Sequence, residues 1–126
     1  TMSIATPKGF EPDKSTVKVS QNLTDIELTT DPLKAAENAD VVVTDTYSSI
    51  HNNDSKRIKK FIPKYQVNDK IMNLAKKNAI FLHCLPAKRD QEVTSSVIDG
   101  PQSVVWDEAE NRLHTQKALL CALLHA

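Results

Sequence analysis

The chain has few of the residues that mark phosphate-binding loops, disulfide-rich proteins or membrane proteins. It contains two glycines among 126 residues, which leaves little backbone freedom for a glycine-rich loop around a phosphate. Its two cysteines, Cys84 and Cys121, stand far apart and do not form a disulfide framework. No apolar run approaches the length of a bilayer span, and the first residues do not resemble a leader peptide. These absences predict a reducing compartment, the cytoplasm, with the mitochondrial matrix as the alternative.

The balance of charge limits the function further. Sixteen basic and sixteen acidic side chains cancel, so no long-range field favours nucleic acid or an anionic membrane as a partner. A hydrophobic content of 40% is ordinary for a globular protein, and the length allows a core of modest size. We therefore expect a single domain, residues 1–126, that binds neither nucleic acid nor membrane.

Short extended segments alternate with helical patterns along the chain. The predicted strands are Met2–Ala5, Ile26–Thr29, Val41–Thr44, Ala79–His83 and Ser103–Trp106. The predicted helices are Ser15–Leu23, Leu33–Ala39 with Asp31 as its N-cap, Ser55–Phe61, Lys70–Lys77 with Asn68 as its cap, Ser95–Ile98 and Glu108–Ala126. This alternation predicts an α/β domain with one parallel sheet between helices on both faces.

Three residues whose side chains can bind or react with a substrate follow predicted strands. Asp45 follows the third strand, Cys84 follows the fourth, and Arg112 lies in the segment after the fifth. The carboxyl ends of parallel strands meet at one edge of a sheet, where α/β proteins bind ligands. A carboxylate can hold an ammonium group, and a guanidinium group can bind a phosphate or a developing oxyanion. This edge of the sheet therefore suits a site that binds an amine and a negatively charged acyl donor.

The residues alone leave other roles open. On spacing, a buried structural role for Cys84 is slightly favoured, and a thiol beside a carboxylate has less reason to ionise than one beside an arginine. Zinc is not predicted, because His83 and Cys84 are adjacent and should point to opposite faces of a strand. A nucleophilic pair of Cys84 with His51 or His114 remains an alternative. Cys121, in a dense apolar run of the last helix, is expected in the core.

Several motifs of the chain occur together, in the same order, in one known family. The motifs are Ala5-Thr6-Pro7-Lys8-Gly9-Phe10-Glu11-Pro12, Asp40-Val41-Val42-Val43-Thr44-Asp45-Thr46, Tyr65-Gln66-Val67-Asn68, His83-Cys84-Leu85-Pro86 with Glu92-Val93, Ser103-Val104-Val105-Trp106 and Glu108-Ala109-Glu110-Asn111-Arg112. Over essentially its whole length the chain thereby resembles the C-terminal half of the ornithine carbamoyltransferases.

The resemblance implies a Rossmann-like three-layer domain that binds L-ornithine and is joined to a carbamoyl phosphate domain in a homotrimer. It implies transfer of the carbamoyl group from carbamoyl phosphate to the δ-amine of L-ornithine. The products are citrulline and phosphate, in arginine biosynthesis or a urea-type pathway. No metal or organic cofactor is implied.

The same resemblance assigns roles to individual residues. Asp45 and Ser49 would hold the α-amino end of ornithine, and Ile50 belongs to the same substrate-binding loop. Cys84 would lie beside Asp45 and help to orient and deprotonate the reacting amine. The backbone of Leu85 and the side chain of Arg112 would contact the carbamoyl group, so that Arg112 stabilises its oxygen as charge develops. The expected catalytic residues are Cys84, Asp45 and Arg112.

The chain also departs from the family pattern. We expect the family's first β-α unit and its carbamoyl phosphate domain to be absent, and the lone chain to be inactive. The family's Ser-Met-Gly loop is Ser49-Ile50-His51 here, and Tyr47 stands where tryptophan is usual. Two further hypotheses therefore stay open. The enzyme could act on another amine, such as putrescine or acetylornithine, or the chain could be a non-catalytic fragment or paralogue that serves as a binding module.

Overall fold

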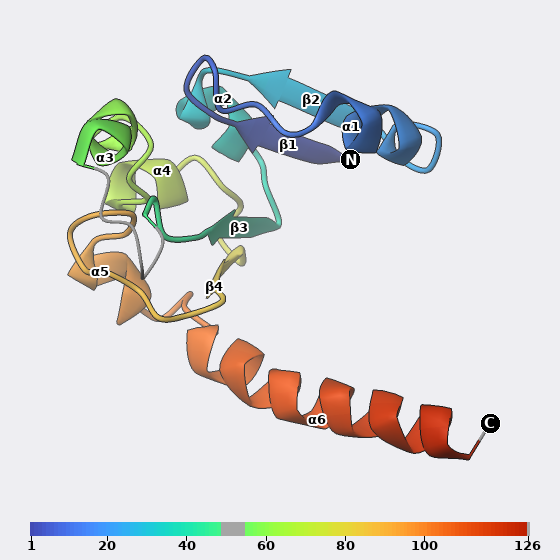
Figure 1. Ribbon diagram of the computed structural model, residues 1–126. Coiled ribbons are helices and arrows are strands. Elements are labelled where there is room, and N and C mark those ends of the chain that lie inside the picture. Colours follow the sequence, from blue (N-terminus) through green and yellow to red (C-terminus); the bar gives the residue numbers. More distant parts are fainter. Residues whose placement is uncertain (49–54, 126) are drawn as a thin grey trace.

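The computed structural model describes residues 1–48 and 55–125, in which four strands alternate with six helices (Figure 1). The strands are β1 (Met2–Ala5), β2 (Ile26–Thr29), β3 (Val41–Thr44) and β4 (Ile80–His83). The helices are α1 (Lys14–Ser20), α2 (Pro32–Ala36), α3 (Ser55–Phe61), α4 (Asp69–Met72), α5 (Ser95–Ile98) and α6 (Val105–Leu124). No helix of this described part is both long and apolar enough to cross a membrane.

The strands pair in parallel, which confirms the predicted α/β class. β1 pairs with β2, so that Met2 lies opposite Ile26. β3 pairs with β4, so that Thr44 at the end of one strand lies opposite His83 at the end of the other. Three of the strands begin and end at the predicted residues, and β4 starts one residue later than predicted. The sequence pattern therefore places the strand ends correctly.

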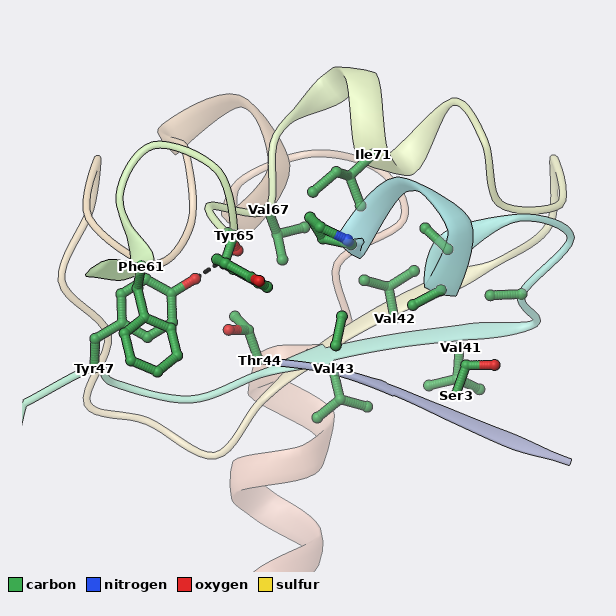
Figure 2. A pocket seen from close by; sticks show the side chains of 15 residues that line it. Ser3, Val41, Val42, Val43, Thr44, Tyr47, Phe61, Tyr65, Val67 and Ile71 are labelled. Atoms are coloured by element: carbon green, nitrogen blue, oxygen red, sulfur yellow. Dashed lines mark hydrogen bonds between the residues drawn. The ribbon is translucent and has the colours of Figure 1, made fainter. Parts of the chain in front are cut away.

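The prediction of one continuous sheet is wrong for the described residues. They form two separate two-stranded sheets, β1-β2 and β3-β4. A cavity of about 150 Å³ lies between the sheets, lined by Ser3 from β1, by Val41 and Val43 from β3, and by aromatic and aliphatic side chains beyond them (Figure 2). Without hydrogen bonds between β1 and β3, each sheet has an open edge at this cavity.

The predicted fifth strand is also wrong. Of the segment Ser103–Trp106, only Ser103 makes a β-bridge, to Phe81, and the N–H of Val104 donates to the carbonyl of Phe81 at 3.0 Å. Helix α6 then begins at Val105. Two acidic residues, Asp107 and Glu108, lie in its first turn, where the helix dipole favours negative charge. The helix preference of the acidic first turn therefore outweighs the strand preference of the β-branched residues Val104 and Val105.

The predicted caps of the short helices are confirmed. Asp31 accepts a hydrogen bond from the N–H of Leu33 at 3.1 Å, and the next residue is a proline in the first turn of α2. Asn68 accepts from the N–H of Ile71 at 3.2 Å and starts α4. Helix α2 ends earlier than predicted, before Asn38, whose φ of 56° is left-handed and incompatible with a continuing helix.

The main core lies between β3, β4 and the short helices that cover one side of them. Val42 of β3 points into this core, whereas Val43 points to the other side of the strand and is 63% exposed (Figure 2). Phe81 of β4 is fully buried at its centre. The other buried members are Ala36, Val67, Ile71, Met72, Val93, Val97, Ile98 and Val105. A second cluster is aromatic, with the rings of Tyr47 and Phe61 stacked at 4.5 Å between centroids.

Helix α6 projects from the rest of the chain (Figure 1). Its start packs against β4, and Val105 is its buried residue. Beyond the first turns the helix is exposed, and this includes Cys121. The expectation that Cys121 lies in the core is therefore wrong, because no described segment packs on that part of α6.

Candidate active site at the carboxyl end of β4

The parallel register of β3 and β4 brings Asp45 and Cys84 together. Because Thr44 lies opposite His83, the residues that follow them leave the sheet side by side. The thiol of Cys84 donates a hydrogen bond to Oδ1 of Asp45 at 3.3 Å, and both side chains are exposed. The same oxygen accepts from the N–H of Thr46 at 2.6 Å, which holds the carboxylate toward the thiol. Two of the three predicted strand-end residues are thus in direct contact.

The surroundings of Cys84 keep its thiol protonated at neutral pH. Partial removal from water raises the pKa of Cys84, and the hydrogen bond to Asp45 and its negative charge raise it further. The carboxylate of Glu108 acts in the same direction. Partial burial, together with the two acidic neighbours, therefore keeps the thiol protonated, and Arg112 does not turn it into a thiolate. At rest the thiol is a hydrogen-bond donor, which does not favour a role as covalent nucleophile.

Arg112 reaches the same place from α6. A groove of about 550 Å³, within the range of small-molecule pockets, has Cys84 and Leu85 on one side and Arg112 on the other. A neighbouring hollow of about 410 Å³ also has both Cys84 and Arg112 in its wall. Arg112 lies in the second turn of the helix and is exposed. The structure therefore places Cys84 and Arg112 in the wall of one groove, and Asp45 is joined to them through its hydrogen bond with the Cys84 thiol.

Two further side chains of the groove are absent from the sequence-based site. Arg89 lines it from the loop after β4, with its guanidinium paired to Asp99, and Trp106 lines it from the first turn of α6. Neither follows a strand directly, so the strand-end argument gives no reason to select them. The position of Trp106 depends on α6 starting early, which the predicted fifth strand obscured.

Leu85 has an unusual backbone conformation at the mouth of the groove. Its φ is 53°, in the left-handed region that side chains other than glycine seldom adopt, and the bond from Leu85 to Pro86 is cis. The N–H of Leu85 donates to Nδ1 of His83 at 2.9 Å. The backbone at Leu85 is therefore fixed by the residue that ends β4.

One group of side chains among the described residues has the spacing of a metal site. The ligand atoms of Asp45, His83 and Cys84 lie within 4.8 Å of one another, even though His83 is buried and Cys84 is exposed. The adjacent positions on the strand therefore do not separate these atoms as the sequence argument assumed. His83 already uses both ring nitrogens, for Leu85 and for Glu92, and would have to give up one bond to bind a metal. The absence of a metal stays a prediction.

The remaining candidates divide into two groups. Ser49, Ile50 and His51 lie outside the described residues. His114 is exposed on α6, and its ring nitrogen lies 3.3 Å from the carboxylate of Glu110 on the same helix, so its described contact is with an acid and not with the thiol.

Comparison with known proteins identifies close relatives of this chain. The family model for the Asp/Orn binding domain of aspartate/ornithine carbamoyltransferase matches residues 1–123. The ornithine carbamoyltransferase of Cenarchaeum symbiosum is 60% identical over 122 residues, which cover 97% of this chain and 40% of that protein.

Solved structures agree with the sequence comparison. The ornithine carbamoyltransferase of Pyrococcus furiosus matches with a TM-score of 0.84 and 46% identity, over 94% of this chain and 40% of that one. The anabolic ornithine carbamoyltransferase of Campylobacter jejuni matches with a TM-score of 0.89 and 37% identity, over 99% of this chain and 43% of that one. The chain thus spans about 40% of the length of the relatives it matches.

Proposed function

Because the chain belongs to the aspartate/ornithine carbamoyltransferase family, we propose that residues 1–126 are the L-ornithine-binding domain of an ornithine carbamoyltransferase. In the proposed reaction the δ-amine of ornithine attacks the carbonyl carbon of carbamoyl phosphate. A carbon–nitrogen bond forms, the bond from that carbon to the phosphate oxygen breaks, and the nitrogen loses a proton. Citrulline and phosphate leave, and citrulline serves arginine biosynthesis. The contact between Asp45 and Cys84, with Arg112 across the groove, carries the proposal.

Each of these residues has a role that its geometry supports. Asp45 has an exposed carboxylate next to Cys84 and attracts the ammonium group at the α-carbon of ornithine. Cys84 orients the δ-ammonium group of ornithine. This group gives one proton to the Cys84 sulfur while the thiol proton passes to the Asp45 carboxylate, so that the amine becomes neutral and Asp45 holds the proton. Arg112 donates to the carbamoyl oxygen, which gains negative charge when the carbon is attacked. The backbone of Leu85 borders the same groove and contacts the carbamoyl group.

The choice of amine depends on residues other than Asp45, Cys84 and Arg112. In our proposal Ser49 and Ile50 complete the ornithine site, and they lie outside the described residues. Putrescine and acetylornithine differ from ornithine at the α-carbon, so their use in place of ornithine would mean that this loop recognises a different end group.

We further propose that the active protein is longer and contains a carbamoyl phosphate domain. Two apolar surfaces support this. Val41 and Val43 expose the outer side of β3, and α6 beyond its second turn exposes a set of leucines, Leu113, Leu119, Leu120, Leu123 and Leu124. Large exposed apolar patches usually mark interaction surfaces. We expect the longer protein to form a homotrimer, and the 126-residue chain to be inactive because it lacks the donor-binding half of the site.

The test measures citrulline formation from ornithine and carbamoyl phosphate by the longer protein and, separately, by the 126-residue chain. We expect turnover by the longer protein only, with ornithine preferred over putrescine and acetylornithine. Arg112→Ala in the longer protein should lower kcat about 100- to 1,000-fold, the usual loss for a donor to a developing oxyanion. Lys117→Ala, which removes another exposed cation of α6, is the matched control.

Each outcome decides between the hypotheses. Preference for putrescine or acetylornithine would replace ornithine as the substrate. No transfer to any of the three amines by the longer protein would leave the binding module as the better explanation. An equal loss in Arg112→Ala and Lys117→Ala would remove Arg112 from the site.

A further inference from the structure

Two ionisable side chains are completely buried directly behind the groove, and the proposed reaction does not use them. His83 and Glu92 are each 0% exposed. Oε1 of Glu92 lies 3.3 Å from Nε2 of His83, across nine positions of sequence. Burying two such groups is unfavourable unless they are bonded, and a pair of this kind fixes local geometry at some cost in stability. The pair therefore needs an explanation other than packing.

The hydrogen bonds of His83 determine where its ring proton lies. The N–H of Leu85 donates to Nδ1 at 2.9 Å, so Nδ1 must present a lone pair. The proton of the neutral ring is then on Nε2 and points at Glu92. The carboxylate thereby selects the tautomer, and the tautomer determines whether the ring can accept the Leu85 N–H.

Glu92 is itself held by hydrogen bonds to both its side chain and its backbone. Its Oε1 also accepts from the N–H of Lys88, which closes the loop after β4 onto the carboxylate. Its backbone carbonyl accepts from the N–H of Val67 at 2.9 Å, and the next residue, Val93, is fully buried. Glu92 therefore connects the loop to a rigid part of the fold.

The end of this chain of contacts is the backbone of Leu85. A left-handed conformation is unfavourable at a residue other than glycine and persists only where the surroundings hold it. At Leu85 the holding contact is the bond from its N–H to His83. The conformation sets the direction of the Leu85 carbonyl and of the neighbouring Cys84, which both border the groove.

We infer that Glu92 and His83 are positioning residues for the transfer reaction. Glu92 orients His83, His83 holds Leu85 in its left-handed conformation, and Leu85 presents the backbone and the Cys84 thiol to the carbamoyl group. This inference rests on the proposed function for its catalytic consequence, but the geometry of the thiol can be measured without any turnover.

The experiment uses pairs of variants in the longer protein that either keep or remove one acceptor. His83→Asn keeps an oxygen near the position of Nδ1, whereas His83→Leu removes the acceptor for the Leu85 N–H. Glu92→Gln keeps an acceptor for the ring proton, whereas Glu92→Met fills a similar volume without one. Tyr65→Phe is the stability control, because it removes a part-buried hydrogen bond to the Thr30 carbonyl, 2.8 Å long, in another part of the fold.

Two readouts separate positioning from folding. The first is the division between kcat and KM for ornithine: His83→Leu and Glu92→Met should lower kcat about 100-fold, the loss expected from a misplacement of about 1 Å, with KM little changed. The second is the rate at which iodoacetamide alkylates Cys84, followed by peptide mass spectrometry. Both variants should alkylate faster, because the thiol leaves the carboxylate of Asp45, and the acceptor-keeping variants should stay near the parent in both readouts.

The outcomes are distinct for the two proposals. Loss of melting temperature without a change in kcat or in the alkylation rate, as expected for Tyr65→Phe, would overturn the positioning role. If His83→Leu does not fold, Glu92→Met against Glu92→Gln decides the matter by the same measurements. If the parent protein alkylates as expected but forms no citrulline, the proposed function fails, and the alkylation rates alone decide whether the buried pair positions Cys84.

Discussion

Replacing Phe81 with alanine should lower the free energy of unfolding of this chain by about 3–5 kcal/mol. Phe81 is 0% exposed and belongs to the main core, together with Val42, its partner on the neighbouring strand, and Val105 at the start of α6. Loss of its transfer free energy accounts for about 1.5–3 kcal/mol, and the cavity left by the ring accounts for the rest. A small domain has only about 5–15 kcal/mol in total, so the variant should retain at most about four fifths of its stability.

The assay is urea denaturation followed by far-ultraviolet circular dichroism, with the slope m compared between variants. Val43→Ala is the matched control, because Val43 lies on the neighbouring strand but is 63% exposed. Its truncation should change the stability of this chain by less than about 0.5 kcal/mol. In the longer protein the same change should cost more, since we expect another segment to cover that side of β3.

A loss of less than about 1.5 kcal/mol in Phe81→Ala at an unchanged m would show that Phe81 is not a filled core position, because removing a packed ring costs more than that. Equal losses in Phe81→Ala and Val43→Ala would refute the prediction as well, since the two sides of the β3-β4 sheet would then be equally buried.

Three further predictions concern the site and one turn. Asp45→Asn should speed alkylation of Cys84 at pH 8, because the Asp45 carboxylate helps to raise the pKa of the thiol; unchanged labelling of the Cys84 peptide would contradict this. Because the pKa of Cys84 is raised in the folded chain, its contribution to stability is complete below about pH 9 and is lost as the pH rises through the folded pKa; urea titrations should therefore show a steeper alkaline loss than for Cys84→Ala. Gly100→Ala should destabilise the chain by about 1–3 kcal/mol, since its Cβ would lie 2.5 Å from the Ser96 carbonyl oxygen, and an unchanged melting temperature would argue against that contact.

The elements that sequence predicts well are those with a complete local signal. The run Val41-Val42-Val43-Thr44 has four β-branched residues before an acid, and β3 matches it residue for residue. Asp31 followed by proline predicts the start of α2, and its side-chain cap is present. The contact of Asp45 with Cys84 follows from the same logic, because two parallel strands that end in register must bring the next residues together.

The errors have a different origin, since they concern contacts between distant segments. Val104 and Val105 favour a strand by themselves, but Ser103 alone reaches the sheet and the acids that follow favour a helix. Cys121 has a core-like sequence environment, yet burial of a helix depends on what packs against it. The buried contact between Glu92 and His83 is not predictable from the sequence, because a carboxylate nine residues after a histidine has no periodicity that indicates a buried pair.

The contact between Asp45 and Cys84 joins residues 39 positions apart, and this separation has a consequence for how the chain folds. Closing a flexible loop of that length costs about 3 kcal/mol of chain entropy, so β3 and β4 pair only when enough of the core forms with them. The short capped helices can form from local interactions, but the thiol meets its carboxylate only after the distant halves of the chain have met. A chain that is collapsed but incompletely paired therefore has a more reactive Cys84 than the native chain. The alkylation rate of Cys84, the residue that we propose to orient the substrate, therefore also reports whether β3 and β4 have paired.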